Sequence, residues 1–219
     1  FVRVKNDQLI LGKDGEEQTT LDLNQFDRIS LVGGGKATAP MALAMEELLG
    51  ERVRTGMINV KYGFTEKLGV TRTVEASHPL PDENGVKGTE AILDYLAKTN
   101  DKDLIISLIS GGGSALLCQP AQGITLGEKQ TLTGMLLDCG ASIDEINAVR
   151  KHISAAKGGQ MARAAFPATV VNLMLSDVVG DKMDVIASGP FVPDSSTFED
   201  ALGILRKYDL KGVPGSIVQ

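Results

Sequence analysis

The sequence predicts an α/β protein built on a mostly parallel, doubly wound sheet with helices on both faces. Segments of strand character alternate with segments of helix character along the whole chain. Residues 103–109 (DLIISLI) form a continuous apolar run, which is typical of a central strand covered on both faces. Three candidate strands end in GGGK, SGGGS and SDVVGD. Because ligands of doubly wound sheets bind at the carboxyl ends of the strands, these endings predict one shared site.

The individual elements follow from local pattern. Val2 to Leu11 alternates around a central turn and predicts a short N-terminal β-hairpin. Further strands are expected over residues 28–32, 55–60, 71–76, 103–109 and 169–175, and helices over residues 37–49, 83–98, 125–138, 142–152 and 197–208. The sequences TLGE and SIDE open two of these helices as capping boxes. No linker or repeat divides the chain, so residues 1–219 are expected to form one domain.

Composition narrows the functional classes. Hydrophobic residues make up 42% of the 219, but aromatic residues only 4%, so the core is expected to be aliphatic. The net charge is −6 and the basic residues are scattered, which argues against a nucleic-acid or membrane-surface partner. No apolar stretch is long enough to span a bilayer. Cys118 and Cys139 form no disulfide framework, so we expect free thiols in the cytoplasm, and neither has a neighbouring His or charge pattern that would indicate a nucleophile.

The first candidate phosphate loop is Gly33-Gly34-Gly35, followed by Lys36. Glycines let backbone amides turn toward an anion, and the helix that follows adds the positive end of its dipole. Lys36 stands where it could neutralise a phosphate as a point charge. The spacing is not that of a Walker A motif. The alternative interpretation is a glycine-rich turn with a solvated lysine.

The second candidate loop is Ser110-Gly111-Gly112-Gly113-Ser114, directly after the predicted central strand. Its backbone amides could cradle a phosphate or a carboxylate. The alternative is a tight strand-to-helix turn. Two such loops at matching positions of one sheet favour a binding function, and all eight residues from Gly33–Gly35 and Ser110–Ser114 are predicted to contact the cofactor.

Charged residues supply candidates for catalysis. Arg150, on a predicted helix, could grip a carboxylate or phosphate with two parallel hydrogen bonds. Asp177 follows a predicted buried strand and could bind Mg²⁺ or orient a substrate hydroxyl, with Asp181 assisting at the metal. The alternatives are a solvated helix face for Arg150 and an Asx-turn for Asp177. His78 is a weaker candidate for substrate contact, because a lone histidine is more often structural or exposed.

Together these segments resemble the N-terminal domain of the class II glycerate kinases, the MOFRL-containing family whose members have also been described as hydroxypyruvate reductases. The matching segments run from about Ser30 to Tyr208. They are VGGGKATAPMA, EASHPLPDENG, LISGGGSALL, GITLGEKQTLTGMLL, SIDEINAVRKHISAAKGGQMA, LMLSDVVGDKMDVIASGP and VPDSSTFEDAL. Each is weak alone, but the set in this order is highly specific.

The resemblance implies a Rossmann-like domain that faces a C-terminal MOFRL domain across an active-site cleft. It implies ATP and Mg²⁺ as cofactors, D-glycerate as substrate and 2-phosphoglycerate as product, with a homodimer as one possible assembly. Lys36 matches the lysine of the family's first glycine loop, and Gly111 to Ser114 match its second loop. Lys36, Arg150 and Asp177 are therefore predicted to be catalytic. A start without Met and the lack of a closing element before Gln219 favour a fragment or a processed chain.

Two other functions stay open. An NAD(P)-dependent hydroxypyruvate reductase would use G-x-G-x-x-G after a strand, but Thr38 occupies the position of the third glycine. A non-catalytic metabolite-binding module would need only the glycine loops. The sequence does not say which loop holds ATP and which holds glycerate, or which residue is the general base.

Overall fold

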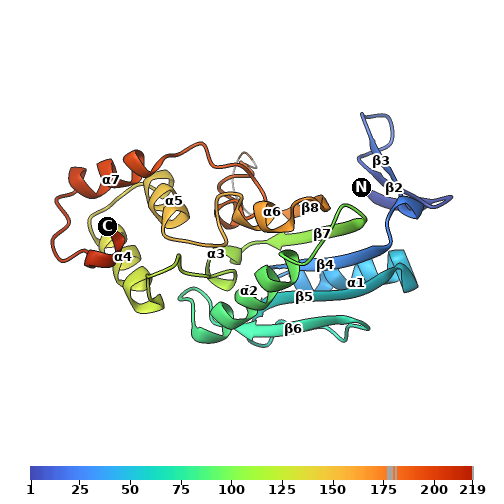
Figure 1. The fold of residues 1–219 in the computed structure, drawn as a ribbon, viewed down its shortest axis with the longest axis horizontal. Helices are drawn as coiled ribbons and strands as arrows, with labels where there is room; N and C mark the ends of the chain where they lie inside the picture. The colour runs from blue at the N-terminus through green and yellow to red at the C-terminus, as the bar shows by residue number, and fades with distance from the viewer. Residues whose placement is uncertain (177–179, 181, 219) are drawn as a thin grey trace.

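A computed structural model describes residues 1–176, 180 and 182–218 of the chain. Its centre is a parallel sheet with the strand order β6-β5-β4-β7-β8, as Figure 1 shows. The strands are β4 (Arg28–Gly34), β5 (Val53–Lys61), β6 (Thr71–Ala76), β7 (Asp103–Ser110) and β8 (Thr169–Leu175). The order reverses between β4 and β7, so a doubly wound sheet has its ligand crevice at the carboxyl ends of these two strands. The predicted α/β fold is confirmed.

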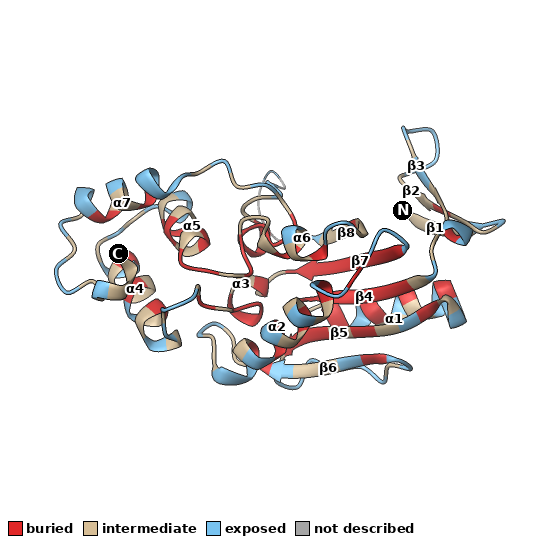
Figure 2. Cartoon of the chain, viewed as in Figure 1, coloured by how far each residue is buried: buried red, intermediate tan, exposed pale blue. Residues whose placement is uncertain are grey.

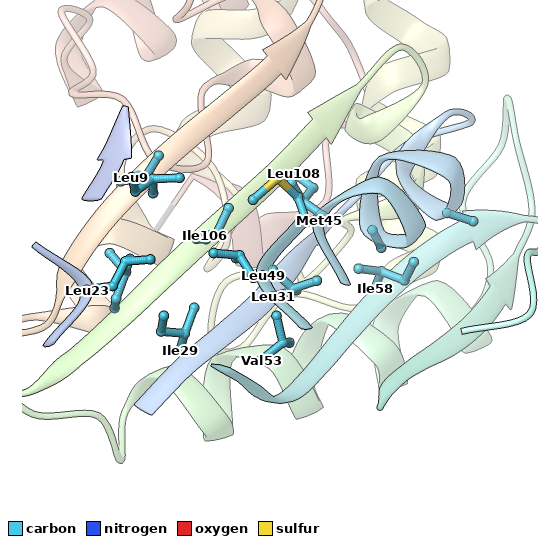
Figure 3. Close-up of a cluster of buried hydrophobic side chains, with 14 of the residues drawn as sticks. Leu9, Leu23, Ile29, Leu31, Met45, Leu49, Val53, Ile58, Ile106 and Leu108 are labelled. Atoms are coloured by element: carbon cyan, nitrogen blue, oxygen red, sulfur yellow. The ribbon is translucent and has the colours of Figure 1, made fainter. Parts of the chain in front are cut away.

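Helices cover both faces of this sheet. Successive strand residues point to opposite sides, so apolar side chains stand on both faces and pack against helices there. Leu104, Ile106 and Leu108 of β7 pack on the side of α1 (Thr38–Leu49), in the cluster drawn in Figure 3. Ile105 and Ile109 pack on the other side with α2 (Glu83–Leu96) and α6 (Gln160–Ala165). β7 is buried along its whole length (Figure 2). The two-sided burial explains why this segment is apolar without alternation.

A small antiparallel sheet stands at the amino terminus, with the order β1 (Val2–Lys5), β2 (Gln8–Leu11) and β3 (Thr19–Asp22). The predicted hairpin is confirmed, and its turn residues Asn6 and Asp7 both have positive φ angles. The third strand was not predicted. Its sequence, TTLD, is short and half exposed, so it has no alternation that would reveal it before it pairs with β2.

A helical region lies beyond the carboxyl ends of the strands, at the end of the molecule away from the small sheet (Figure 1). Its helices are α3 (Gly113–Leu116), α4 (Leu126–Asp138), α5 (Ile143–His152) and α7 (Phe198–Lys207). Short 3-10 helices span Leu23–Gln25, Gly50–Arg52, Ile186–Ser188 and Gly215–Ile217. Both predicted capping boxes are present, at Thr125 and Ser142. Within the described ranges, no helix is long and apolar enough to cross a membrane.

Candidate functional site

The two predicted glycine loops lie side by side at the switch point of the sheet. β4 and β7 are hydrogen-bonded neighbours, with Gly34 opposite Ile109. The Lys36 amide donates to the Gly111 carbonyl at 2.9 Å, and the Ala37 amide donates to Ser110 Oγ at 3.0 Å. Residues that are more than 70 positions apart in the sequence therefore form one structural unit at the expected edge of the sheet.

Close approach of the backbones explains the glycines of the first loop. A Cβ atom on Gly35 would lie 2.0 Å from Ser110 Oγ, and one on Gly33 would lie 2.0 Å from the Leu108 carbonyl oxygen. Both residues also have φ angles near +150°. The Gly35 amide donates to the Asn59 carbonyl, so the amides of residues 35, 36 and 37 are all used inside the protein. The Lys36 side chain is thus the group of this loop that remains to reach an anion.

The second loop brings three sequence-predicted residues together. Gly112 has φ +85°, and a Cβ atom there would lie 2.9 Å from His78 Cδ2 and 3.3 Å from Lys36 Cγ. Gly112 therefore lets the His78 ring and the Lys36 side chain approach the loop. Among the described residues, the amides of Gly112 and Gly113 have no hydrogen-bond acceptor. This loop, unlike the first, has free backbone donors for an anion.

A cavity of about 390 Å³ opens beside the second loop. It lies between the segment 78–81, the second loop and helices α4 and α5. Gln130 of α4 closes one side by donating to the Pro81 carbonyl at 2.7 Å. The polar side chains in its wall are His78, Ser114, Cys118, Lys129, Gln130, Thr133 and Arg150. The volume falls at the lower end of the usual range of ligand pockets, roughly 300–1,000 Å³.

Two buried lysines, Lys129 and Lys157, and the half-buried Arg150 lie around this cavity. Burial lowers the pKa of Lys129 to about 8, and repulsion from Arg150 adds to the effect. Burial, followed by repulsion from Arg150 and Lys129, holds the pKa of Lys157 well below its ordinary value. Burial also lowers the pKa of Arg150. Each shift has the sign expected for a cation removed from water without a neighbouring carboxylate.

The hydrogen bonds distinguish the three cations. The Lys157 ammonium donates to the carbonyls of Ser114, Leu117 and Ala187 at 2.8, 3.3 and 3.4 Å. Lys129 donates to the Ile153 carbonyl at 3.0 Å. Within the described part of the chain, Arg150 Nε is buried without an acceptor. Lys157 therefore braces the second loop, whereas Lys129 and Arg150 line the cavity.

A hydroxyl network positions Ser114 at the same loop. Ser114 Oγ lies 2.8 Å from Ser188 Oγ, and Ser188 Oγ donates to Asn147 Oδ1 at 3.1 Å. Ala187 and Ser188 have φ angles of +53° and +61°, which are costly for residues with a side chain. Strained backbone of this kind persists only where the surroundings over-determine it, and here it borders the second loop.

Sequence reasoning found part of this arrangement and missed part of it. Lys36, the second glycine loop and Arg150 are brought to one region. Lys129 was missed, although it precedes Leu132 by three positions and Leu136 by seven on the buried face of α4. A lysine within an apolar helical stripe is a usable signal. The sequence around Cys118 also gave no sign that Lys129, Arg150 and Lys157, from distant segments, interact electrostatically with it.

The predicted metal ligands Asp177 and Asp181 lie outside the described residues. β8 ends level with the second loop, since Leu175 pairs with Ser110. In the described ranges, no group of three or more His, Cys, Asp or Glu side chains could hold a metal ion. The magnesium prediction therefore depends on these two aspartates.

Fold and site together define a doubly wound α/β protein with two adjoining glycine loops and a cavity lined by cationic side chains at its switch point. Residues 2–219 match the family described as "Domain of unknown function (DUF4147)", and the chain belongs to this family. It is 49% identical over 199 residues to a protein of Thermotoga maritima named D-glycerate 2-kinase. The aligned region covers 90% of this chain and 48% of the relative. A relative from Agrobacterium vitis, whose name proposes a hydroxypyruvate reductase, is 44% identical over 84% of this chain and 48% of its own length.

A solved structure extends the comparison to three dimensions. The crystal structure of a glycerate kinase from Thermotoga maritima superimposes with a TM-score of 0.84 at 50% identity, over 88% of this chain and 46% of that one. The resemblance to glycerate kinases is thereby confirmed. The chain spans about half the length of the relatives it matches.

Proposed function

We propose that this chain is the N-terminal half of a glycerate 2-kinase, which transfers the γ-phosphate of ATP to the 2-hydroxyl of D-glycerate. The observation that carries the proposal is the junction of two glycine loops, with Lys36 between them, at the switch point of the sheet. The glycerate kinase names of similar proteins support the choice of substrate.

The proposed reaction is an in-line phosphoryl transfer, in which the protein mainly positions groups and neutralises charge. The Lys36 ammonium holds phosphate oxygens, and the free amides of Gly112 and Gly113 hold an anionic group beside it. Arg150 holds the glycerate carboxylate. Gly33 and Gly35 contribute by letting β4 approach β7, and Gly34, Gly111, Ser110 and Ser114 complete the two loops.

Further parts of the proposal extend beyond the described residues. Asp177 and Asp181 would hold Mg²⁺, which neutralises charge on the transferring phosphoryl group when bound. Asp177 is also the candidate acceptor of the substrate hydroxyl proton. A C-terminal MOFRL domain would close the crevice, in agreement with relatives of about twice this length. We place the protein in the cytoplasm because its two cysteines are free, and a homodimer is part of the proposal.

A hydroxypyruvate reductase is the second candidate, favoured by the name of the Agrobacterium relative. A packing observation opposes it. The third glycine of a dinucleotide fingerprint serves close contact between helix and strand. Thr38 stands at that position, buried, with its hydroxyl 3.2 Å from Ser110 Oγ. A non-catalytic binding module would retain the loops but form no product.

One assay separates these functions. The full-length protein is incubated with ATP, Mg²⁺ and D-glycerate, and ADP release is followed while ³¹P NMR identifies the product. We expect ADP and 2-phosphoglycerate in equal amounts. Reduction of hydroxypyruvate by NADH or NADPH without ADP formation would establish the reductase instead, and binding of glycerate without either product would establish the binding module.

A further inference from the structure

An excess of positive charge is buried beside the second glycine loop. Lys129 comes from α4, Arg150 from α5 and Lys157 from the segment before α6. Lys129 is 3% exposed and Lys157 is 1% exposed. No carboxylate of the described residues acts on the pKa of any of the three, and their charged forms are favoured by coupling to Cys118 and, for the two lysines, by hydrogen bonds to backbone carbonyls. Buried charges in proteins are normally paired, so this cluster lacks an anion.

The unused donors show where that anion would bind. Lys157 is saturated by three carbonyl oxygens and does not line the cavity. An ammonium group carries three protons, and Lys129 uses one of them on the Ile153 carbonyl. Arg150 Nε has no acceptor among the described residues, although it is buried. Lys129 and Arg150 both line the cavity, so both side chains border the same space.

A purely structural role does not explain Lys129. Its one acceptor among the described residues, the Ile153 carbonyl, also accepts a hydrogen bond from the Ala121 amide at 3.1 Å. The carbonyl would stay paired without the lysine. The same face of α4 carries Leu132 and Leu136, so an apolar side chain would pack there without the cost of a buried charge.

We propose that Lys129 and Arg150 form an oxyanion subsite, in which the two side chains jointly hold a carboxylate or phosphate group of a small-molecule ligand. Lys157 braces the second loop from behind and takes no direct part in binding. Identification of the ligand group as the carboxylate of D-glycerate rests on the proposed function. The oxyanion chemistry stands on the cluster itself.

The test measures binding and stability in the full-length protein at constant ionic strength. D-glycerate and inorganic phosphate are titrated by calorimetry into the wild type, Lys129→Met and Arg150→Met, with Lys98→Met as the control for an exposed lysine. Each subsite variant should raise the Kd of the preferred anion by roughly tenfold to a hundredfold, because a hydrogen bond to a charged group is lost. Lys98→Met should bind like the wild type.

The thermal stability of Lys129→Met distinguishes a binding lysine from a structural one, because loss of a structural lysine would lower Tm. Without ligand, Lys129→Met should raise Tm by at least roughly 2–4 °C, because the repulsion from Arg150 and Lys157 and the desolvation cost disappear. An unchanged Kd in both subsite variants would overturn the proposal. A lower Tm for Lys129→Met with an unchanged Kd would overturn it as well and make Lys129 structural.

The two anions identify the source of the bound group. Tighter, Lys129-dependent binding of D-glycerate assigns the subsite to the acid, whereas the same dependence for inorganic phosphate assigns it to a phosphate group. Lys129-dependent binding without ADP formation would uphold the subsite and refute the kinase. Wild-type turnover by both subsite variants would uphold the kinase and refute the subsite.

Discussion

At the scale of single residues, Lys36 has the most direct role in the proposed chemistry. Its backbone is fixed by the Gly111 carbonyl, and its side chain passes over Gly112 beside His78. We expect Lys36→Ala to lower kcat by roughly tenfold to a hundredfold, since a charge-assisted contact in the transition state contributes about 1.5–3 kcal/mol. Steady-state kinetics of ADP release would measure the effect.

The control for this variant is Lys67→Ala, because Lys67 is exposed on the segment between β5 and β6. Circular dichroism would verify that Lys36→Ala is folded. Turnover close to that of Lys67→Ala would remove Lys36 from the mechanism.

The cationic residues of the site differ in how far the local sequence reveals their role. Lys36 and Arg150 could be proposed from sequence because each stands next to a recognisable feature, a triple glycine or a basic cluster on a helix. Lys157 precedes two glycines and gives no sign that its ammonium will bind three carbonyls from two other segments. Its burial depends on partners that are about 30 to 43 positions away.

At the scale of elements, the contact between the ends of β4 and β7 determines the shape of the crevice. Gly35→Ala should destabilise the protein by at least roughly 2 kcal/mol, because its Cβ would overlap Ser110 Oγ and alanine disfavours the positive φ angle. Urea denaturation followed by circular dichroism would measure the change in the free energy of unfolding.

Gly203→Ala is the matched control, since Gly203 lies exposed within α7 and a Cβ atom there would have no other atom within 4 Å. This substitution should stabilise the protein by about 0.5–1 kcal/mol through helix propensity. If both substitutions changed stability equally, close packing would not be the reason for glycine at position 35.

At the scale of the whole molecule, the chain has the core of an independent domain but an open crevice. The sheet is packed on both faces, and α4, α5 and α7 have a cluster of their own. We expect the 219-residue chain to unfold cooperatively on heating yet to show less than roughly a tenth of the full-length turnover, because phosphate contacts open to water are screened.

Calorimetry and the ADP assay on the isolated chain would measure both properties, and addition of the C-terminal half as a separate chain should restore activity. Turnover of the isolated chain equal to that of the full-length protein would contradict this account.

The sequence by itself determined the fold class, the order of the main elements and the places where the two glycine loops occur. These features follow from local patterns: the apolar run of β7, the capping boxes at Thr125 and Ser142, and glycines directly after strands. Only the tertiary structure decided that the amides of residues 35–37 donate to Asn59, Gly111 and Ser110. It also decided that Lys129, Arg150 and Lys157 lie close enough to Cys118 to interact with it electrostatically. Hydrogen-bond partners and buried charges depend on distances between segments far apart in the chain, and no local pattern contains those distances.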